Sequence, residues 1–201
     1  MPHPRTVSIQ PDTPLPDLDF QAVVKPRFGS WGRDVQLCRN SAEFERYLEA
    51  LAVKPWFRRT GAVAQELIAS HGHDLRVLVA GGSVVGAAKR IAASGEWRTN
   101  VALGGSTVPV ESSPVACELA RAAAAAIGID LVGVDLLPTG PGSFCVIELN
   151  GAVDFDATYS LRGGNVFAEA AAALCRVAAR RSVVGERGAA LSADEWIGQA
   201  S

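Results

Sequence analysis

The feature that most limits the possible folds is the pairing of short apolar segments across turn sequences. Segments 75–80 and 84–92 flank a diglycine at 81–82, and segments 131–137 and 144–150 flank a run rich in proline and glycine. Such a pair is typical of a β-hairpin, whose two strands are antiparallel. Along the chain, the segments with the apolar spacing of helices come after strands that are already paired as hairpins. The sequence therefore predicts an α+β fold rather than a doubly wound parallel sheet.

Three segments have the spacing or composition of helices. The first begins at a cap, Asn40 or Ser41, and the second begins at the cap Ser113 and ends before Gly128. The third is an alanine-rich helix expected over 165–180. Further strands are expected at the segments that alternate or end in turn residues, namely 6–9, 22–26, 35–38, 62–68 and an extended piece at 97–101.

Composition excludes several classes of function. The chain has 201 residues, a net charge of -2 and no run of Lys and Arg, so nucleic acid is not expected as a ligand. The N-terminal residues have no apolar core of a signal peptide, and no charge-free stretch approaches the length of a membrane span, which favours a cytoplasmic protein without membrane contact. The four cysteines stand singly, as small apolar side chains do.

The hairpin at 131–150 carries the clearest chemical signal. Asp135 lies within an apolar run on one arm, and Glu148 and Asn150 stand two residues apart on the other, so they share a face of the strand. If Asp135 points to that face, oxygen ligands suited to magnesium converge there. The alternative interpretation is that Asp135 pairs with an arginine and Glu148 is an edge-strand charge, and the residues alone favour neither.

Two further groups of residues could meet phosphate. Lys25 closes an apolar strand and precedes a loop with Gly29, Ser30 and Gly32, whose backbone N–H groups could approach phosphate oxygens, although the Walker pattern is absent. A plain hairpin is the alternative for this loop. The second group lies within or beside strands, where cross-strand ion pairing, as of Asp74 with Arg90, is the alternative for any one member; it comprises Asp74, Arg76, Lys89, Arg90, Arg98, Thr99 and Asn100.

Taken together and in this order, these pieces resemble the RimK and LysX branch of the ATP-grasp superfamily. The resemblance extends from about Met1 to Phe167, and six segments carry it: VVKPRFGSWGRDV (23–35), QELI (65–68), GHDLRVLVAG (72–81), EWRTNVALGG (96–105), GVDLL (133–137) and VIELNGAVDF (146–155). It implies two α+β lobes whose antiparallel sheets grip ATP: a first lobe over 1–68 with a glycine-rich lid at 27–33, a second lobe with the metal site over 69–181, and a polar tail at 182–201.

The resemblance also implies a role for each matched residue. Asp135, Glu148 and Asn150 would hold two Mg²⁺ or Mn²⁺ ions. Arg90, Arg98 and Asn100 would act in catalysis at the phosphates and the acyl phosphate. ATP, the co-substrate, would contact Lys25, Gly29, Ser30, Gly32, Gln65, Glu66, Leu67, Ile68, Asp74, Arg90, Arg98, Thr99 and Asn100.

The implied activity is ATP-dependent joining of a carboxylate to an amine through an acyl phosphate, as in α-L-glutamate ligases, with amino acids or peptides as substrates. Members of this branch normally carry an N-terminal α/β domain and a helix with another ATP-contacting lysine, and neither is among these 201 residues. That difference leaves three expectations: a separate N-terminal domain as partner, self-association, or a non-catalytic ATP-binding module. Residues after Asn150, namely Asp154, Asp156, Tyr159 and Arg162, are expected to bound the substrate pocket.

Overall fold

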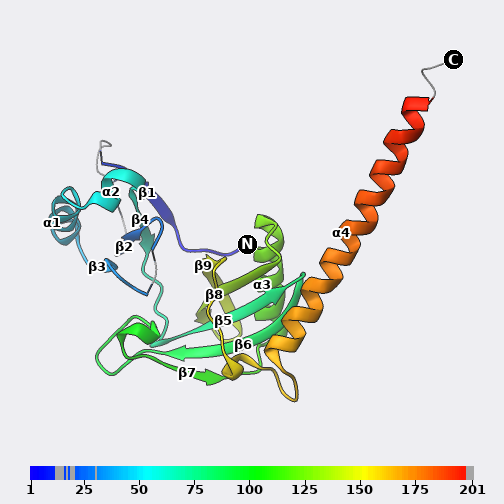
Figure 1. Cartoon of the computed structure of the whole chain (residues 1–201). Coiled ribbons are helices and arrows are strands. Elements are labelled where there is room, and N and C mark those ends of the chain that lie inside the picture. Colours follow the sequence, from blue (N-terminus) through cyan, green and yellow to red (C-terminus); the bar gives the residue numbers. More distant parts are fainter. Residues whose placement is uncertain (12–15, 17, 19–20, 30, 198–201) are drawn as a thin grey trace.

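The structure, a computed structural model, contains two antiparallel sheets with helices packed against them. It describes residues 1–11, 16, 18, 21–29 and 31–197, with side chains up to Ser182. The predicted α+β class is confirmed, because within the described residues every paired strand is antiparallel and each sheet has its own helices (Figure 1).

The smaller sheet, with its two helices, forms the first lobe. Its strand order is β1-β4-β2-β3. The elements are β1 (Thr6–Ile9), β2 (Ala22–Pro26), β3 (Gln36–Cys38), α1 (Ser41–Leu51), α2 (Pro55–Thr60) and β4 (Ala62–Glu66). Alternate strand residues such as Val24 and Ala64 face the helices, where they meet Phe44, Leu48 and Leu51. This lobe therefore has its own apolar core.

The larger sheet forms the second lobe, in the order β7-β6-β5-β8-β9. Its elements are β5 (His73–Ala80), β6 (Ser83–Ile91), the 3₁₀ turn η1 (Val101–Leu103), β7 (Ser106–Pro109), α3 (Pro114–Ile127), β8 (Leu131–Gly140), β9 (Ser143–Asn150), the 3₁₀ turn η2 (Ala157–Tyr159) and α4 (Val166–Ile197). The diglycine hairpin is confirmed, since Gly81 and Gly82 both have positive φ, 54° and 77°.

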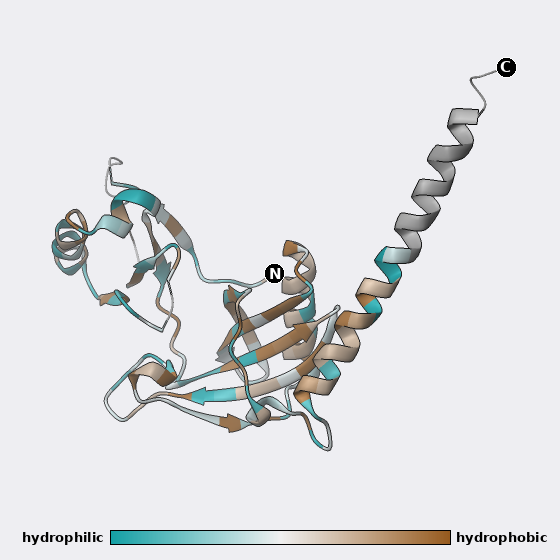
Figure 2. Ribbon diagram, viewed as in Figure 1, coloured by the Kyte–Doolittle hydropathy of each residue, from teal (hydrophilic) through white to brown (hydrophobic). Residues whose placement is uncertain are grey.

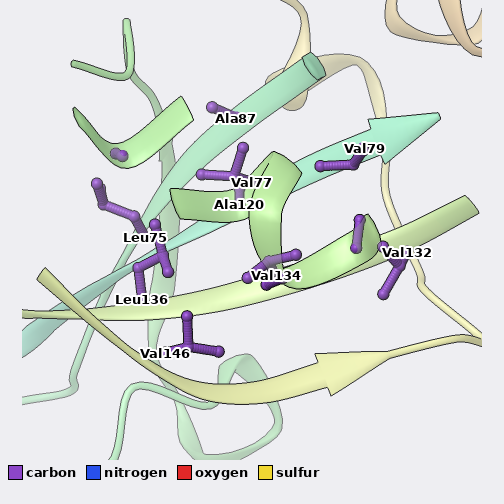
Figure 3. Packing of buried hydrophobic residues seen from close by; sticks show 12 residues of the cluster. Leu75, Val77, Val79, Ala87, Ala120, Val132, Val134, Leu136 and Val146 are labelled. Carbon is purple, nitrogen blue, oxygen red and sulfur yellow. The ribbon is translucent and has the colours of Figure 1, made fainter. Parts of the chain in front are cut away.

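The two faces of the larger sheet have different cover. Side chains such as Val77 and Val134 point toward α3 and its small alanines, of which Ala120 is labelled in Figure 3. Their neighbours, such as Leu78 and Ala80, point the other way and meet the first turns of α4. Figure 2 shows the hydrophobic colours gathered on these strands and on the part of α4 that lies against them. The part of this sheet face that α4 does not cover carries polar side chains.

The structure differs from the predicted elements at several places, and one of them is the short edge strand β7, which the sequence did not predict. The sequence reading missed α2, which has only six residues. Segment 97–101 forms no strand, and its end lies in η1. Residues 67 and 68 lie beyond β4. The last helix continues to Ile197, so residues 182–197 of the expected polar tail are helical; alanine and arginine there have high helix propensity, which the polar composition concealed.

The N-terminal residues join the two lobes. The backbone N–H of Val146 in β9 donates to the carbonyl of Pro2 at 3.0 Å, and the chain then enters β1 in the other sheet at Thr6. Cys38 and Cys145 are buried and Cys117 is half-buried, as expected of small apolar side chains, whereas Cys175 is exposed on α4.

Within the described residues, none of the helices combines the length and the apolar composition needed to span a bilayer.

Candidate functional site

A cleft of about 1380 Å³ lies where the two lobes meet, lined by residues of both. Among the residues that the structure describes, every ligand implied by the family resemblance lines it, whereas Lys89 of the wider phosphate group does not. The lining ligands are Lys25, Gly29, Gly32, Gln65, Glu66, Leu67, Ile68, Asp74, Arg90, Arg98, Thr99, Asn100, Asp135, Glu148 and Asn150. Ser30 lies outside the described residues. Of the expected substrate-pocket residues, Asp154, Asp156 and Tyr159 also line the cleft, whereas Arg162 is not among its lining residues.

The hairpin brings the three expected metal ligands together. Asp135 on β8 pairs in register with Glu148 on β9, and Asn150 lies two residues further along the same strand. The Asn150 amide joins the cluster in either orientation: Nδ2 lies 3.3 Å from Asp135 Oδ2, or, after a flip that satisfies both amide atoms, 3.2 Å from Glu148 Oε1. The predicted convergence on one face of the hairpin is therefore present.

Asp135 is at the same time held by two arginines. Arg76 Nε and Nη2 donate to its two carboxylate oxygens at 2.7 and 2.8 Å, and Arg90 Nη2 donates to Oδ2 at 2.8 Å. Burial alone would raise the pKa of Asp135, but the two guanidinium groups lower it overall. The interpretation that Asp135 pairs with an arginine is confirmed, together with the convergence.

Asp74 extends this network to the neighbouring strand. Asp74 and Arg90 are cross-strand partners of β5 and β6, and Arg90 donates to both Asp74 oxygens at 2.8 and 2.6 Å. The hydroxyl of Thr99 donates to the same carboxylate at 2.6 Å. Asp74 and Asp135 are each 1% exposed and Arg90 is 6% exposed, so these are buried, fully paired charges. The predicted pairing of Asp74 with Arg90 is confirmed.

Lys25 faces this cluster from the first lobe. It is the last residue but one of β2 and lies close enough to Glu148 and Asp135 for their charges to affect its ammonium group. Burial lowers the pKa of the Lys25 ammonium, and the two carboxylates offset only part of that effect. Among the described residues, none makes a hydrogen bond or ion pair with its ammonium group. A half-buried cation without a protein partner in a cleft is a natural site for an anion.

Glu148 is a carboxyl group whose pKa is shifted in the direction opposite to that of Lys25. Its burial, and next the nearby charge of Asp135, raise the pKa of the Glu148 carboxyl, while Lys25 acts in the opposite direction. A cation at this position would relieve the repulsion between the two carboxylates. The raised pKa is compatible with a metal ligand, and because β9 is an edge strand of the larger sheet, Glu148 is an edge-strand charge as well.

The donor set fits a hard cation in its chemistry. Two carboxylates and one amide oxygen are the ligands that magnesium takes from proteins. Within the described residues, no cluster of three or more His, Cys, Asp or Glu side chains could hold a metal ion, so Asn150 is needed to complete the set. Because the Asp135 oxygens already accept three arginine N–H groups, a cation there would compete with the two guanidinium groups for the charge of the carboxylate.

Several predicted ligands are engaged with other protein groups. Glu66 forms an ion pair of 3.3 Å with Arg5, and the Gln65 amide donates to the Thr6 hydroxyl at 3.2 Å. Arg98 forms a two-pronged pair with Glu96 at 3.0 and 2.8 Å. These side chains still line the cleft, but some of their hydrogen-bonding groups are already bonded to the protein.

Arg76 was expected only as one of the strand residues that could meet phosphate, and the family resemblance gave it no role in the site. It stands two positions after Asp74 on β5, hence on the same face, and opposite Asp135 in the register of β5 and β8. The alternation of Asp74 and Arg76 in an otherwise apolar strand was the available signal.

Solved structures with this arrangement are ATP-grasp ligases. The ATP-grasp ligase PsnB complexed with a minimal precursor aligns with a TM-score of 0.59 and 19% identity, over 88% of this chain and 55% of that chain. The D-alanine–D-alanine ligase from Bacillus anthracis complexed with ATP aligns with a TM-score of 0.61 and 16% identity, over 90% of this chain and 62% of that chain. Two such lobes of antiparallel sheet, joined at a cleft, define the ATP-grasp fold.

Sequence comparison identifies the family. Residues 11–174 match the profile of the RimK-like ATP-grasp domain, and the chain belongs to that family. Human beta-citrylglutamate synthase B is 34% identical over 160 residues, 78% of this chain and 40% of its own length. A probable alpha-L-glutamate ligase from Psychromonas ingrahamii is 35% identical over 146 residues, 72% of this chain and 46% of its own.

A third relative is similar over a shorter region. The glutamate–LysW ligase ArgX of Sulfolobus acidocaldarius is 30% identical over 136 residues, 68% of this chain and 48% of its own length. The chain thus spans less than half the length of these curated relatives. The resemblance inferred from the six sequence segments is confirmed at the level of the family.

Proposed function

We propose that this chain is the ATP- and magnesium-binding part of a ligase that joins a carboxylate to an amine through an acyl phosphate. The observation that carries the proposal is the unpaired ammonium of Lys25, which faces two carboxylates and two arginines across one cleft. Three acidic and three basic side chains in that space leave little net charge, so an incoming triphosphate would bring its own cations with it. They are Lys25, Arg76, Arg90, Asp74, Asp135 and Glu148.

In this proposal the chain binds ATP between two lobes, 1–68 and 69–181. Lys25 holds phosphate oxygens beneath the glycine-rich loop of 27–33, and the segment 65–68 meets the adenine edge. Asp135, Glu148 and Asn150 would hold two magnesium or manganese ions, which neutralise charge on the β- and γ-phosphates when bound. The 1380 Å³ of the cleft exceeds the needs of a nucleotide alone and leaves room for an acid substrate.

The chain's residues would act by positioning and charge stabilisation. The substrate carboxylate attacks the γ-phosphorus, ADP leaves, and the amine then attacks the acyl carbon and expels phosphate. Arg90 and Arg76 both donate hydrogen bonds to Asp135. When these bonds weaken, the two guanidinium groups would stabilise the charge on the transferred phosphoryl group. Thr99 holds Asp74 in place behind Arg90 through its 2.6 Å bond.

The substrate class follows from the relatives rather than from the site. Two of them are named as glutamate ligases and one as beta-citrylglutamate synthase. PsnB was solved with a precursor peptide. We therefore propose an amino acid or a peptide terminus as the acid and an amino acid such as glutamate as the amine.

A non-catalytic ATP-binding module is the second candidate. Its support is the state of Arg98, whose guanidinium is bonded to protein groups rather than directed freely into the cleft. Release of phosphate on addition of ATP and a panel of amino acids and peptides separates the two candidates. Binding without turnover across a broad panel, tested also with the full-length product of the reading frame, would favour the module.

Nucleotide binding itself is tested by thermal unfolding with and without ATP and magnesium. A ligand at a hundredfold excess over its Kd adds about 2.7 kcal/mol, or about 5–10 °C in Tm for a chain of this size. We expect this shift for the wild type and none for Glu148→Ala, whose own fold stays intact. A wild-type shift in Glu148→Ala would contradict the metal assignment, and no shift in either protein would contradict the proposed function.

A further inference from the structure

The second half of the glycine-rich loop adopts a conformation that needs outside support. This return arm, residues 31–35, leads from the loop into β3. Trp31 and Asp34 have φ values of 61° and 54°, and Gly32 has 68°. The left-handed region is unfavourable for a bulky side chain such as that of tryptophan, and such a conformation persists only where surrounding contacts impose it.

One set of contacts comes from the first lobe. The hydroxyl of Tyr47 donates to the backbone carbonyl of Asp34 at 2.8 Å. The Asp34 carboxylate accepts from Trp56 Nε1 at 3.0 Å and from Lys54 Nζ at 3.4 Å. These bonds hold the base of the return arm to α1 and α2, but they do not direct it toward the other lobe.

The second set comes across the cleft, from Arg98. One amino group, Nη1, donates to the backbone carbonyls of Gly32 and Val35 at 3.1 and 3.4 Å. The other two nitrogens donate to Glu96, so four of the five N–H donors of this guanidinium are engaged. Glu96 also accepts the backbone N–H groups of Trp97 and Arg98. The bonds from the Arg98 guanidinium first, and then these backbone bonds, lower the pKa of the Glu96 carboxyl to about 2.

The return arm is close to the second lobe at another point as well. A methyl group added at Gly32 would lie 2.7 Å from Asn100 Oδ1 and 3.1 Å from Leu103 Cδ1. Only a residue without a side chain permits this approach. The segment 96–103 of the second lobe is thus shaped to receive Gly32, with Arg98 bonded to the carbonyls on either side of the approach.

We propose that Arg98 is a positioning residue: oriented by Glu96, it clasps the return arm to the second lobe and holds the glycine-rich loop against the cleft. The clasp consists of protein groups alone, so it forms without nucleotide. A clasped loop would slow the release of ADP. This consequence rests on the proposed function. The role differs from the direct contact with phosphates that the family resemblance implies for Arg98.

Limited proteolysis of the ligand-free protein tests the clasp directly. Trypsin cleaves after Arg33 only when the return arm leaves the second lobe, and the rate follows the population of that open form. In Arg98→Gln we expect cleavage after Arg33 to be about tenfold faster, the effect of losing a charge-assisted hydrogen bond. Cleavage after Arg181, exposed on α4, serves as the internal reference.

Further variants separate the clasp from a general loss of stability. Arg39→Gln removes an exposed cation of the first lobe, whose ion-pair partner among the described residues is Glu43, and should leave cleavage after Arg33 unchanged. Glu96→Gln should accelerate it less than Arg98→Gln, and the double variant should equal Arg98→Gln, because Glu96 acts through Arg98. Gly32→Ala opens the contact from the opposite side and should also accelerate cleavage.

The nucleotide readout distinguishes positioning from direct contact. With a fluorescent ADP analogue, Arg98→Gln should release nucleotide about tenfold faster, and Arg98→Lys should recover part of the wild-type rate because it keeps the charge and one donor. Unchanged cleavage after Arg33 in folded Arg98→Gln and Gly32→Ala would overturn the clasp. Absence of nucleotide binding in the wild type would overturn the proposed function but not the proteolysis result.

Discussion

The buried charges of the cleft are arranged as a chain of pairs in which each carboxylate has a guanidinium partner. Arg76 contacts Asp135, Arg90 contacts both Asp135 and Asp74, and Thr99 completes the partners of Asp74. Such a network contributes less to stability than its short distances suggest, because desolvation offsets much of the attraction. It does make the removal of any one member costly.

Asp74→Ala should reveal this cost. The substitution leaves the buried guanidinium of Arg90 with one carboxylate instead of two, and we expect a loss of about 3–5 kcal/mol in the free energy of unfolding. The exposed pair of Arg39 with Glu43 provides the control, since Arg39→Ala removes only the cation of that pair and should cost about 1 kcal/mol or less. Urea unfolding measures both, and equal losses would contradict the buried network.

Removal of the Lys25 charge should raise the free energy of unfolding, whereas removal of Asp74 lowers it. Because its charged form is disfavoured by burial, its lowered pKa means that stability rises as the pH increases toward 10.5, the ordinary value for lysine. Lys25→Met should therefore stabilise the ligand-free chain by about 1 kcal/mol, or about 2–4 °C in Tm. The same variant should lose the shift caused by ATP and magnesium. A less stable ligand-free variant would show that Lys25 has a partner in the folded chain.

Adjacent serines before α3 offer a matched test of helix capping. The Ser113 hydroxyl accepts the backbone N–H of Ala116 at 3.2 Å, so Ser113→Ala should cost about 1 kcal/mol. The Ser112 hydroxyl is buried and, among the described residues, has no hydrogen-bond partner. Ser112→Ala should thus be neutral or stabilising. Thermal unfolding of the two variants should differ in sign, while nucleotide affinity stays the same in both.

Elements with strong local signals were predictable from the sequence. The Ser113 cap and the Gly128 terminus of α3 are where the pattern puts them, with Gly128 at φ 66°. The side chain of Asn40 caps α1, which decides between the two candidate caps. These signals depend on backbone groups within a few residues, and so the chain sequence contains them fully.

Segments whose conformation depends on the opposite lobe were not predictable. Segment 97–101 pairs with no strand, and its side chains are held instead by Asp74, which binds Thr99, and by the carbonyls of Gly32 and Val35, which bind Arg98. The site was predictable in part for the same reason. Strand alternation places Asp135, Glu148 and Asn150 on one face, but it does not say which arginine reaches them from another strand.

The two lobes have separate cores, which bears on how the chain unfolds. The buried cluster of the first lobe comes from residues 9–64, and the two clusters of the second lobe come from 75–173, with no residue in common. Contact between the lobes is made by polar groups at the cleft and by the N-terminal residues. Cooperation between the lobes should therefore be incomplete.

Calorimetry of the ligand-free chain should then depart from a two-state transition. We expect the van't Hoff enthalpy to fall below the calorimetric enthalpy, because the smaller lobe unfolds first. ATP with magnesium contacts both lobes in the proposed function and should bring the two enthalpies closer together. A ratio of one without ligand would mean that the lobes form a single cooperative unit.

The exposure of Cys175 has a practical use. It lies on α4, which leads away from the body of the protein, whereas Cys38 and Cys145 are buried and Cys117 is half-buried (Figure 1). A maleimide reagent should accordingly modify the thiol on α4 first. Immobilisation on a sensor surface through that thiol would leave the cleft facing the solution, so that binding of small molecules could be followed without an added tag.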